Sequence, residues 1–456
     1  MLGFRRSGSR RRTCARGCAV FVICAAALVV PGAGSSLAVS VPSFATRKSY
    51  ATGKIPVSVA IADLNGDGKP DVAVANEGAE SESVSVLLNR GDGRLQPRRD
   101  YATGLEPSSV VIGDLNGDGK LDLATANEDN HTVSVLLNRG DGSFRAKRDY
   151  PAGFVVSLAI GDLNGDGKPD LAGADWSSGS VSVFINKGDG SLQPKHTYRT
   201  GTETESVAIG DLNDDGKPDL AAANRYAGRP TVSVLLNRGD GSFSAKHDYA
   251  GADPVWVTIG DLNGDGRPEL AVANFELRSV SVFANNGDGT FRKRRDYATG
   301  NGTRSVAIGD LNGDGRPDLA TTDLEANTVS VLVNKGVGFG RRLAYATGSG
   351  PVQLAIGDLN GDGREDLVTA DFRGPFTASV LVNSPSPLCV VQKAEGATLS
   401  AARQTLARAH CRVGKILRAY SRRVRTGRVI SQSPRPYKVL SAGGKVNLVV
   451  SRGRKS

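Results

Sequence analysis

The sequence predicts an all-β chain: a closed ring of seven four-stranded blades, or seven-bladed β-propeller, followed by a small α+β domain. Three observations predict this. A "DLNGDG" motif recurs with a period near 50 residues, each period holds four strand-like segments, and the last period lacks one strand that the segment before the first can supply. The motif or a near copy starts at Asp63, Asp114, Asp162, Asp211, Asp261, Asp310 and Asp358.

The fourth repeat shows the predicted elements in order. Segment 206–211, "SVAIGD", is the first strand, the acidic loop turns the chain, and 220–224, "LAAAN", is the second strand. In the third strand, "TVSVLLN", Val232, Val234 and Leu236 alternate toward one face. "RGDG" then predicts a tight turn, because Asp-Gly favours hairpins, and "SFSAKHDY" is the fourth strand. A solenoid is the main alternative, and the Gly-rich hairpins and the absence of predicted helices in the repeats count against it.

The ends of the repeat region predict how the ring closes. The seventh repeat ends at 379–383 without a fourth strand, and residues 44–53, "FATRKSYATG", match the fourth strands of the other repeats. We expect this N-terminal strand to complete the last blade, which removes an exposed sheet edge. A tyrosine recurs at the corresponding positions Tyr50, Tyr101, Tyr150, Tyr198, Tyr249, Tyr297 and Tyr345.

The first 38 residues predict a secretory signal peptide. Six arginines precede an apolar run over 19–30, and small residues end at Ala38, after which we expect cleavage. A membrane anchor is the alternative, but this run is shorter than the ~20 apolar residues that a spanning helix needs. We therefore expect a secreted protein, extracellular or associated with the cell wall, with no transmembrane segment.

The net charge of +10 conceals an asymmetry along the chain. Residues 388–456 hold 16 basic residues and one acid, a net charge of +15, whereas residues 39–387 hold 35 basic and 46 acidic residues, a net charge of −11. This contrast indicates two domains with different partners: a propeller over 39–383 and, after a linker at 384–388, a small domain over 389–456. Two cysteines, Cys389 and Cys411, remain after the signal, and an even pair in a secreted chain predicts a disulfide.

The recurrent motif has the acid spacing of a calcium-binding loop. In "DLNGDGKPD", residues 63–71, Asp at positions 1, 5 and 9, Asn at 3 and Gly at 6 match the first part of an EF-hand loop. The final Glu of an EF-hand is absent, since Val74 stands at position 12, and strands flank the motif. Each loop places at least three carboxylates within nine residues, and these repel one another unless a cation neutralises them. Metal-free Asx-rich turns are the alternative, and the sevenfold recurrence favours calcium.

Residues 44–383 thus resemble FG-GAP/VCBS-type repeats, the calcium-binding blades also found in integrin α-subunit propellers. The resemblance implies that each loop binds one structural Ca²⁺, up to seven in all, through four side chains and the carbonyl at position 7. Two positions depart from the pattern: Glu269 replaces the last Asp of loop five, and Asp214 replaces the first Gly of loop four. The implied ligands are Asp63, Asn65, Asp67, Lys69, Asp71, Asp114, Asn116, Asp118, Lys120, Asp122, Asp162, Asn164, Asp166, Lys168, Asp170, Asp211, Asn213, Asp215, Lys217, Asp219, Asp261, Asn263, Asp265, Arg267, Glu269, Asp310, Asn312, Asp314, Arg316, Asp318, Asp358, Asn360, Asp362, Arg364 and Asp366.

The other motifs do not indicate an integrin-binding site or a catalytic site. "RGD" occurs at 90–92, 139–141 and 238–240, but its Gly and Asp belong to the recurrent turn, so an integrin ligand is not favoured. No Ser-His-Asp or Cys-His set is visible among the four histidines. We expect no catalytic residues and no enzyme. A secreted lyase or hydrolase that uses a carboxylate pair on polysaccharide is the alternative.

The face opposite the acidic loops is the predicted binding face. The loops and the RGDG turns follow the first and third strands, so they share one face, and the remaining connections lie on the other. Trp176 and Trp256 are the preferred candidates for stacking on a ligand, because Trp256 stands where most repeats have Ser. Packing between blades is the alternative. The aromatic residues that differ between repeats on this face are Phe154, Trp176, Tyr226, Trp256, Phe275, Phe372 and Phe376.

Residues 389–456 resemble a PASTA domain, most specifically in "ATLSAARQTLARA", "GRVISQSP" and "VNLVVSRG". The segment predicts a strand, a helix capped near Thr398, and further strands. The resemblance implies association with cell-wall peptidoglycan, and the charge favours an anionic glycan. Nucleic acid is not favoured, because aromatic residues are not interleaved with the basic ones. One face of the predicted helix carries Leu399, Ala402, Leu406 and Ala409.

Together these features predict a secreted, calcium-binding, non-enzymatic adhesion or recognition module for an unknown glycan or protein. The basic domain would attach it to the wall. A carboxylate pair on the binding face, outside the acidic loops, would favour the enzyme instead, and an aromatic-lined shallow face would favour binding.

Overall fold

A computed structural model describes residues 41–78, 82–225, 229–384, 389–409, 411–440 and 444–455. The predicted signal peptide lies outside the described residues, as does the predicted linker apart from Ser384. No helix in these described ranges is long and apolar enough to cross a membrane.

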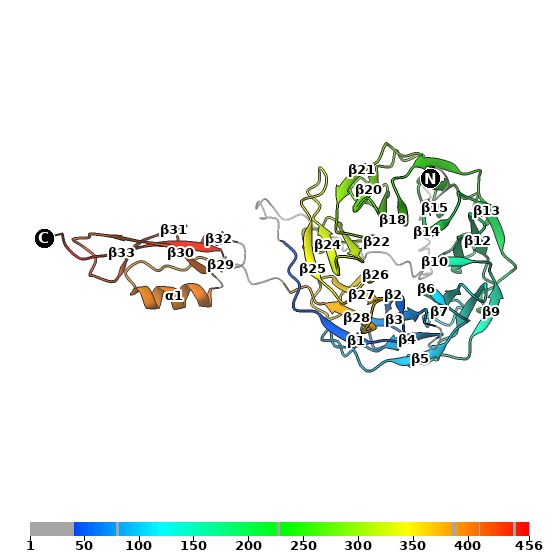
Figure 1. Ribbon diagram of the computed structural model, residues 1–456, viewed down its shortest axis with the longest axis horizontal. Helices are drawn as coiled ribbons and strands as arrows, with labels where there is room; N and C mark the ends of the chain where they lie inside the picture. Colours follow the sequence, from blue (N-terminus) through cyan, green and yellow to red (C-terminus); the bar gives the residue numbers. More distant parts are fainter. Residues whose placement is uncertain are drawn as a thin grey trace, which may run out of the picture.

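In the described part of the chain, seven four-stranded antiparallel sheets stand around a ring, each with its strands in chain order from the centre outward, and the last borrows β1 (Figure 1). The first strands are β2 (Pro56–Ala62), β6 (Pro107–Gly113), β10 (Val155–Gly161), β14 (Thr204–Gly210), β18 (Pro254–Gly260), β22 (Thr303–Gly309) and β26 (Pro351–Gly357). The second strands are β3 (Asp71–Asn76), β7 (Asp122–Asn127), β11 (Asp170–Asp175), β15 (Asp219–Asn224), β19 (Glu269–Asn274), β23 (Asp318–Asp323) and β27 (Asp366–Asp371).

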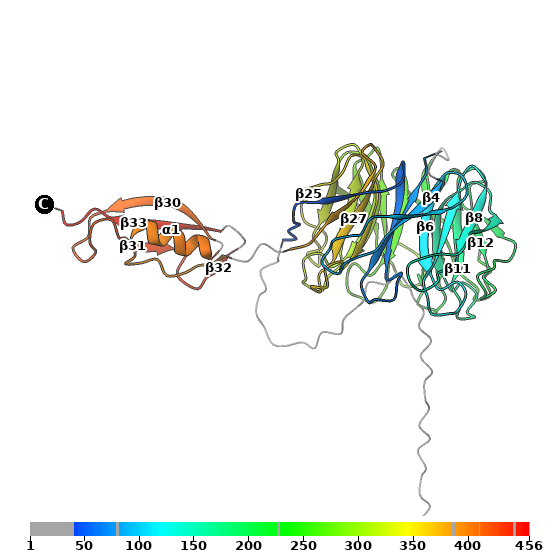
Figure 2. The ribbon, with the colours of Figure 1, turned by 90° about the horizontal axis from the view of Figure 1, so that it is seen from below.

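The outer half of each blade holds the third and fourth strands, and Figure 2 shows the ring from the side, with the strands running between its two faces. The third strands are β4 (Ser83–Leu87), β8 (Thr132–Leu136), β12 (Ser180–Phe184), β16 (Thr231–Leu235), β20 (Ser279–Phe283), β24 (Thr328–Leu332) and β28 (Thr377–Leu381). The fourth strands are β5 (Arg99–Ala102), β9 (Arg148–Pro151), β13 (His196–Arg199), β17 (His247–Ala250), β21 (Arg295–Ala298), β25 (Leu343–Ala346) and β1 (Lys48–Ala51).

The N-terminal strand completes the last blade, as predicted. β1 pairs antiparallel with β28, with Lys48 opposite Val380 and Ala51 opposite Thr377. At the centre, β2 of the first blade packs against β26 of the last, and the Val59 amide donates a 2.7 Å hydrogen bond to Gln353 Oε1. The all-β propeller prediction is therefore confirmed.

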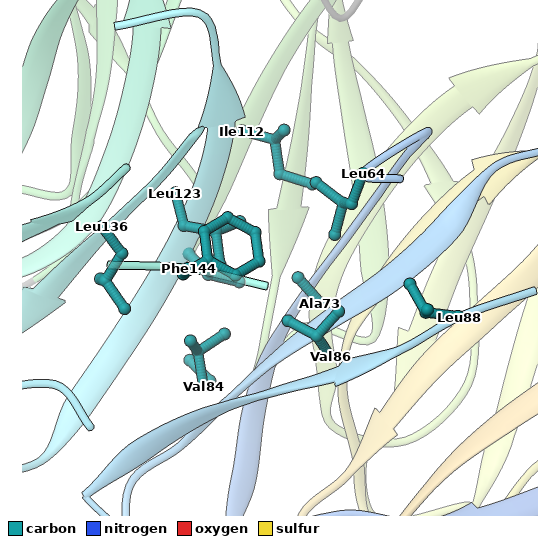
Figure 3. Close-up of a cluster of buried hydrophobic side chains, with 11 residues drawn as sticks. Leu64, Ala73, Val84, Val86, Leu88, Ile112, Leu123, Leu136 and Phe144 are labelled. Atoms are coloured by element: carbon teal, nitrogen blue, oxygen red, sulfur yellow. The ribbon is translucent and has the colours of Figure 1, made fainter. Parts of the chain in front are cut away.

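The hydrophobic core lies between neighbouring blades. Figure 3 shows one such cluster, in which Leu64 and Val86 of the first blade meet Ile112, Leu123 and Phe144 of the second. Every second strand is buried along its whole length, because it has a neighbouring blade on each face. Burial on both faces explains the small residues of "LAAAN", which let the blades approach closely.

The third strand shows the predicted alternation, and its intervening side chains are buried as well, for the same reason. Val232 and Val234 pack toward the fifth blade, as the alternation predicts. Leu236, just beyond β16, is partly buried and packs on the same side, whereas Leu235 packs on the opposite face, toward the third blade. The fourth strand is shorter than predicted. β17 begins at His247, and Phe243 instead forms an isolated bridge with Asn237.

An asparagine at the end of each third strand ties adjacent blades together. In the second blade, Asn138 Nδ2 donates to the Leu64 carbonyl of the first blade at 2.8 Å and to the Leu121 carbonyl of its own blade at 2.7 Å, and its Oδ1 accepts from the Gly140 amide. The same side-chain bonds to the preceding blade recur at Asn89, Asn186, Asn237, Asn285, Asn334 and Asn383.

The basic tail forms a small α+β unit. Its helix α1 (Leu399–Arg408) begins at the predicted cap, where Thr398 Oγ1 accepts a 3.2 Å hydrogen bond from the Ala401 amide. The helix buries Ala402 and Leu406 in the core of this unit, as predicted. The strands are β29 (Cys389–Val390), β30 (Arg412–Ala419), β31 (Val429–Ser433), β32 (Val439–Leu440) and β33 (Lys445–Ser451), with β30, β33 and β31 in one sheet and β29 and β32 in another.

Candidate functional site

The acidic loops follow the first strands, on one face of the ring. In loop one, Asp63 Oδ1 accepts from the Gly66 amide at 2.8 Å and Asp63 Oδ2 accepts from the Gly68 amide at 2.7 Å. The two glycines have φ of 73° and 80°, a conformation in which a Cβ atom is strained. Asn65 Oδ1 accepts from the Asp67 amide at 2.9 Å. The bond equivalent to that of the Gly68 amide recurs in the other six loops.

The last acid of each loop is a buried anchor as well as a predicted ligand. Asp71 is fully buried, and its two oxygens accept hydrogen bonds from the Leu64 amide at 3.0 Å and the Asn89 amide at 2.7 Å. Burial raises the pKa of Asp71 to about 6, although both of these hydrogen bonds favour the charged form. Burial likewise raises the pKa to about 6 at Asp122, Asp170, Asp219 and Asp366.

Both sequence departures fit the loop geometry. Glu269 stands at the position of Asp71, and its longer side chain reaches the Leu262 amide at 2.9 Å and Asn263 Nδ2 at 2.9 Å. Asp214 takes the left-handed conformation of the glycine that it replaces, with φ of 61°. Aspartate is among the few residues that adopt this conformation at modest cost.

The loops offer the oxygen donors that a hard cation requires. Asp318 of loop six is fully buried, and its Oδ2 atom has no hydrogen-bond partner among the described residues, so this loop retains an acceptor for a cation. The donors are not gathered, however. Within the described residues, no loop brings three carboxylate oxygens within 4.8 Å of one another. In loop one the ammonium of Lys69, whose carbonyl was the predicted ligand, pairs with Asp67 at 3.1 Å.

The RGDG turns share this face with the loops and act as structural turns. Asn89, at the start of the first turn, donates from Nδ2 to the Pro70 carbonyl at the end of loop one. Asp92 Oδ1 accepts from the Arg94 amide at 3.1 Å, which closes the turn. The Asp of "RGD" is therefore used within the turn, in agreement with its interpretation as coincidence.

A pocket of about 460 Å³ opens on the opposite face, at the centre of the ring. All seven first strands contribute to it, together with the residues that follow several second strands. Its lining is Val57, Ser58, Glu77, Ser108, Glu128, Phe154, Val156, Trp176, Glu205, Val255, Trp256, Arg304, Leu324, Val352, Gln353 and Phe372.

The pocket brings the two predicted ligand-binding tryptophans together. Trp176 is 38% exposed and lies beside Phe154, with ring centroids 5.8 Å apart. Trp256, from the fifth blade, is partly buried against the neighbouring blade and also lines the pocket. The packing alternative holds for Phe275, which lies in that interblade cluster beneath Arg225. Tyr226 lies outside the described residues, and Phe376 lines a different hollow.

Trp256 replaces a structural hydrogen bond. At this position in other blades, Ser58 Oγ accepts from the Val110 amide of the next blade at 3.0 Å, and Ser206 Oγ accepts from the Val257 amide at 2.9 Å. An indole has no hydrogen-bond acceptor, so Trp256 cannot form this interblade bond and instead places an aromatic ring in the pocket.

Sequence reasoning missed an acidic cluster beside the pocket. Glu77, Glu106 and Glu128 are partly buried and offer carboxylate oxygens within 4.8 Å of one another. Burial raises the pKa of Glu128 to about 7, and repulsion from Glu77 adds to the effect. Burial also raises the pKa values of Glu77 and Glu106. The available signal was that Glu77 and Glu128 both follow the "AxAN" of a second strand, at the position of Trp176.

On the opposite wall of the pocket, the carboxylates form ion pairs with arginines of the same wall. Glu205 lies between two arginines, 3.4 Å from Arg304 and 3.9 Å from Arg225. Arg225 also pairs with Asp253 at 3.2 Å. The charges on this side therefore satisfy one another, which leaves the glutamate cluster as the distinctive electrostatic feature of the pocket.

The tail exposes basic and aromatic side chains. Arg422, Arg423 and Arg425 are exposed in the connection after β30, and Arg452 lies over the exposed Tyr420 ring at 5.9 Å. The predicted disulfide stays a prediction, because the side chain of one cysteine, at position 389, lies outside the described residues.

Comparison with family models finds FG-GAP-like repeats at 63–125, 114–173, 162–222, 211–272, 261–321 and 310–369, and a PASTA domain at 390–452. No curated protein matches the chain.

Among solved structures, the chain is similar to one in the crystal structure of BBS1N in complex with ARL6DN, soaked with mercury, at 13% identity and a TM-score of 0.55, covering 76% of this chain and 98% of that one. It is also similar to Kuenenia stuttgartiensis hydrazine synthase, at 13% identity and a TM-score of 0.51, covering 73% and 97%. An Agrocybe aegerita lectin structure, described as recognising non-reducing terminal N-acetylglucosamine, matches at 23% identity with a TM-score of 0.48, covering 64% and 80%. These likenesses concern the fold alone.

Proposed function

The chain belongs to the FG-GAP-like repeat family, and from this premise we propose that it is a secreted, calcium-binding recognition protein of the cell envelope. Its propeller binds a glycan in the central pocket without chemical conversion, and its PASTA domain holds it to anionic wall polymer or peptidoglycan.

The observation that carries the recognition function is the meeting of Trp176 and Trp256 in one pocket. They come from different blades, and neither belongs to the repeated pattern. Flat aromatic faces beside polar side chains suit stacking on sugar rings. The loss of an interblade hydrogen bond at Trp256 supports a functional reason for this residue, because the indole cannot accept the bond that serine accepts in other blades.

Calcium has a structural role in this proposal. The loop side chains would hold it through hard oxygen donors, and Asp318 Oδ2 supports the fit because it is buried with no partner in the described part of the chain. When bound, the ion supplies positive charge that offsets the repulsion among the loop carboxylates. The lysine at position 7, such as Lys69, would then release its aspartate partner.

Wall attachment rests on the tail. It carries a net charge of +15 and exposes Arg422, Arg423 and Arg425 on one connection. Such a surface attracts phosphate- or carboxylate-rich polymers. A disulfide between Cys389 and Cys411 would link β29 to the segment after α1 and contribute about 3 kcal/mol to a domain of this size.

A polysaccharide-active enzyme is the second candidate, and the glutamate cluster favours it. A carboxylate pair outside the acidic loops was the feature expected of an enzyme, and Glu77 and Glu128 both line the pocket. Their raised pKa values would suit an acid catalyst. The test is release of reducing ends or unsaturated products from wall polysaccharides, compared between the wild type and Glu128→Gln.

Binding of the mature chain to a glycan array and to purified cell walls tests the proposal. The pocket variant combines Trp176→Ala with Trp256→Ser, and the tail variant changes Arg422, Arg423 and Arg425 to Glu. We expect the pocket variant to lose binding to soluble glycans but still to sediment with cell walls. The tail variant should bind soluble glycans but no longer sediment with cell walls. Equal binding by all three proteins would contradict the proposal, and wild-type turnover that Glu128→Gln abolishes would favour the enzyme.

A further inference from the structure

The glutamate cluster gives the pocket an unbalanced acidic side. Glu77 and Glu128 line the pocket, Glu106 lies within 4.8 Å of both, and none of the three forms an ion pair with a described lysine or arginine. Three carboxylates at this separation repel one another strongly when ionised. A cation placed among them would relieve that repulsion.

Arg304, a described cation whose charge acts on the cluster, forms its hydrogen bond elsewhere. Arg304 lies close enough to lower the pKa values of Glu77 and Glu128 by its charge, but its hydrogen bond goes to Glu205. Glu205 in turn lies near Arg225, which pairs with Asp253. These ion pairs on the opposite wall leave the glutamates open to a cation from outside.

Aromatic rings flank the acidic side. Phe154 and Trp176 belong to the third blade, which is next to the second blade that carries Glu128. Trp256 lies on β18 of the fifth blade and also lines the pocket. Figure 1 shows β18 across the ring from β2 and β6. Aromatic faces attract organic cations, and a cation that is held by rings as well as carboxylates is recognised by shape and by charge.

We propose that the central pocket binds an amino sugar through its free ammonium group, with the ammonium at Glu77, Glu106 and Glu128 and the sugar ring against the pocket aromatics. This inference rests on the proposed glycan-recognition function and names its ligand class. A pocket of about 460 Å³ is within the range of small-ligand sites and accommodates one or two sugar residues.

The surroundings favour an organic cation over a bare metal ion. A divalent metal needs several oxygen ligands and has no use for aromatic rings, whereas Phe154, Trp176, Trp256 and Phe372 all line this pocket. A neutral sugar would leave the repulsion among the glutamates in place. An ammonium-bearing sugar uses both features at once.

Isothermal titration calorimetry on the mature full-length chain, at fixed saturating calcium and pH 7.5, tests the proposal. The probes are a glucosamine tetrasaccharide with free amines and its fully N-acetylated counterpart. The proteins are the wild type, Glu77→Gln, Glu128→Gln and Trp256→Ser. Trp256→Ser restores the residue of most repeats, and thermal melting confirms that each variant folds.

We expect the free-amine sugar to bind the wild type at least about tenfold more tightly than the acetylated sugar, equivalent to about 1.4 kcal/mol. Each Glu→Gln change should lower the ratio of the affinities for the free-amine and acetylated sugars by about tenfold. Trp256→Ser should weaken both sugars by about threefold to tenfold, as expected for loss of an aromatic stacking partner.

The outcomes separate this inference from the proposed function. Equal, Trp256-dependent binding of both sugars would overturn the ammonium proposal and leave glycan recognition standing. Failure of both sugars to bind, together with a blank glycan array, would overturn both. Glu128-dependent binding of Mn²⁺ that blocks the amino sugar would assign the cluster to a metal and also overturn the proposal.

Discussion

Removal of calcium should destabilise the ring by an amount proportional to the number of loops that hold an ion. An ion present at 100 times its dissociation constant stabilises the folded state by about 2.7 kcal/mol per site. A ring of about 340 residues has an unfolding entropy of roughly 0.7 kcal/mol/K, so each occupied loop is worth about 4 °C in melting temperature. Seven occupied loops would give a shift of roughly 25 °C on chelation, less if blades unfold separately.

A single-loop variant makes this prediction specific. Asp118 of loop two is partly exposed, its Oδ1 accepts from the Lys120 amide at 3.0 Å, and Asn can keep that bond while losing the charge. Asp118→Asn should lower the melting temperature by about 4 °C in calcium and by nothing measurable in chelator. Asp141→Asn is the matched control, because Asp141 lies on the same face but belongs to an RGDG turn.

Differential scanning calorimetry of the wild type and both variants, with and without chelator, is the assay. A wild-type melting temperature that chelation leaves unchanged would refute the calcium reasoning. So would an Asp118→Asn effect of the same size in chelator, since that would be a loss of loop geometry rather than of an ion.

Three further predictions concern the blades, the pocket and the tail. Asn186→Ala should lower the free energy of unfolding by about 2–4 kcal/mol in urea titrations, because buried backbone groups in two blades lose their partners; a loss below 1 kcal/mol would contradict an interblade role. Affinity for a quaternary ammonium probe, which does not titrate, should rise about tenfold from pH 6 to pH 8 as Glu128, with a pKa of about 7, becomes ionised, and a flat profile would contradict the site. Reversing Arg422, Arg423 and Arg425 to Glu should abolish wall sedimentation at low salt, and wild-type sedimentation should fall as salt is raised to 0.5 M; a salt-independent interaction would contradict electrostatic attachment.

The sign of the pH effect follows from the raised pKa of Glu128. Four groups act on this carboxyl: Glu77 and Glu106 raise its pKa by repulsion, whereas Arg304 and a hydrogen bond from Ser108 lower it, and burial outweighs them all. The folded state therefore holds this proton more tightly than the unfolded state. Its contribution to stability is present at acid pH and is lost as pH rises through about 7, whereas cation binding gains over the same interval.

The features that recur seven times could be predicted from the sequence. A segment whose secondary structure is ambiguous in one repeat can be assigned by comparison with the other repeats. The strand order, the ring and the shared face of loops and turns could therefore be predicted from the repeat. The closing strand followed from one missing segment and one recurrent tyrosine, and β1 pairs with β28 as expected. The interblade asparagines also recur seven times, and this signal was available but unused.

The features that arise once were harder to predict. Glu106 precedes a first strand, whereas Glu77 and Glu128 follow second strands, so only the three-dimensional ring brings the three together. Likewise, strand alternation predicted one buried face for the third strand, whereas a blade between two neighbours buries both, and Leu235 packs on the face opposite Val232, Val234 and Leu236. Trp256 could be singled out because it stands where five of the seven repeats have Ser.

A crystal structure of the mature chain grown with calcium and the glucosamine tetrasaccharide tests the central claim most directly. The account predicts a sugar in the ring-centre pocket, with its amine at Glu128 and a ring face on Trp176 or Trp256, and calcium in the loops of the opposite face. A sugar bound at the loop face, or an empty pocket at saturating ligand, would contradict it.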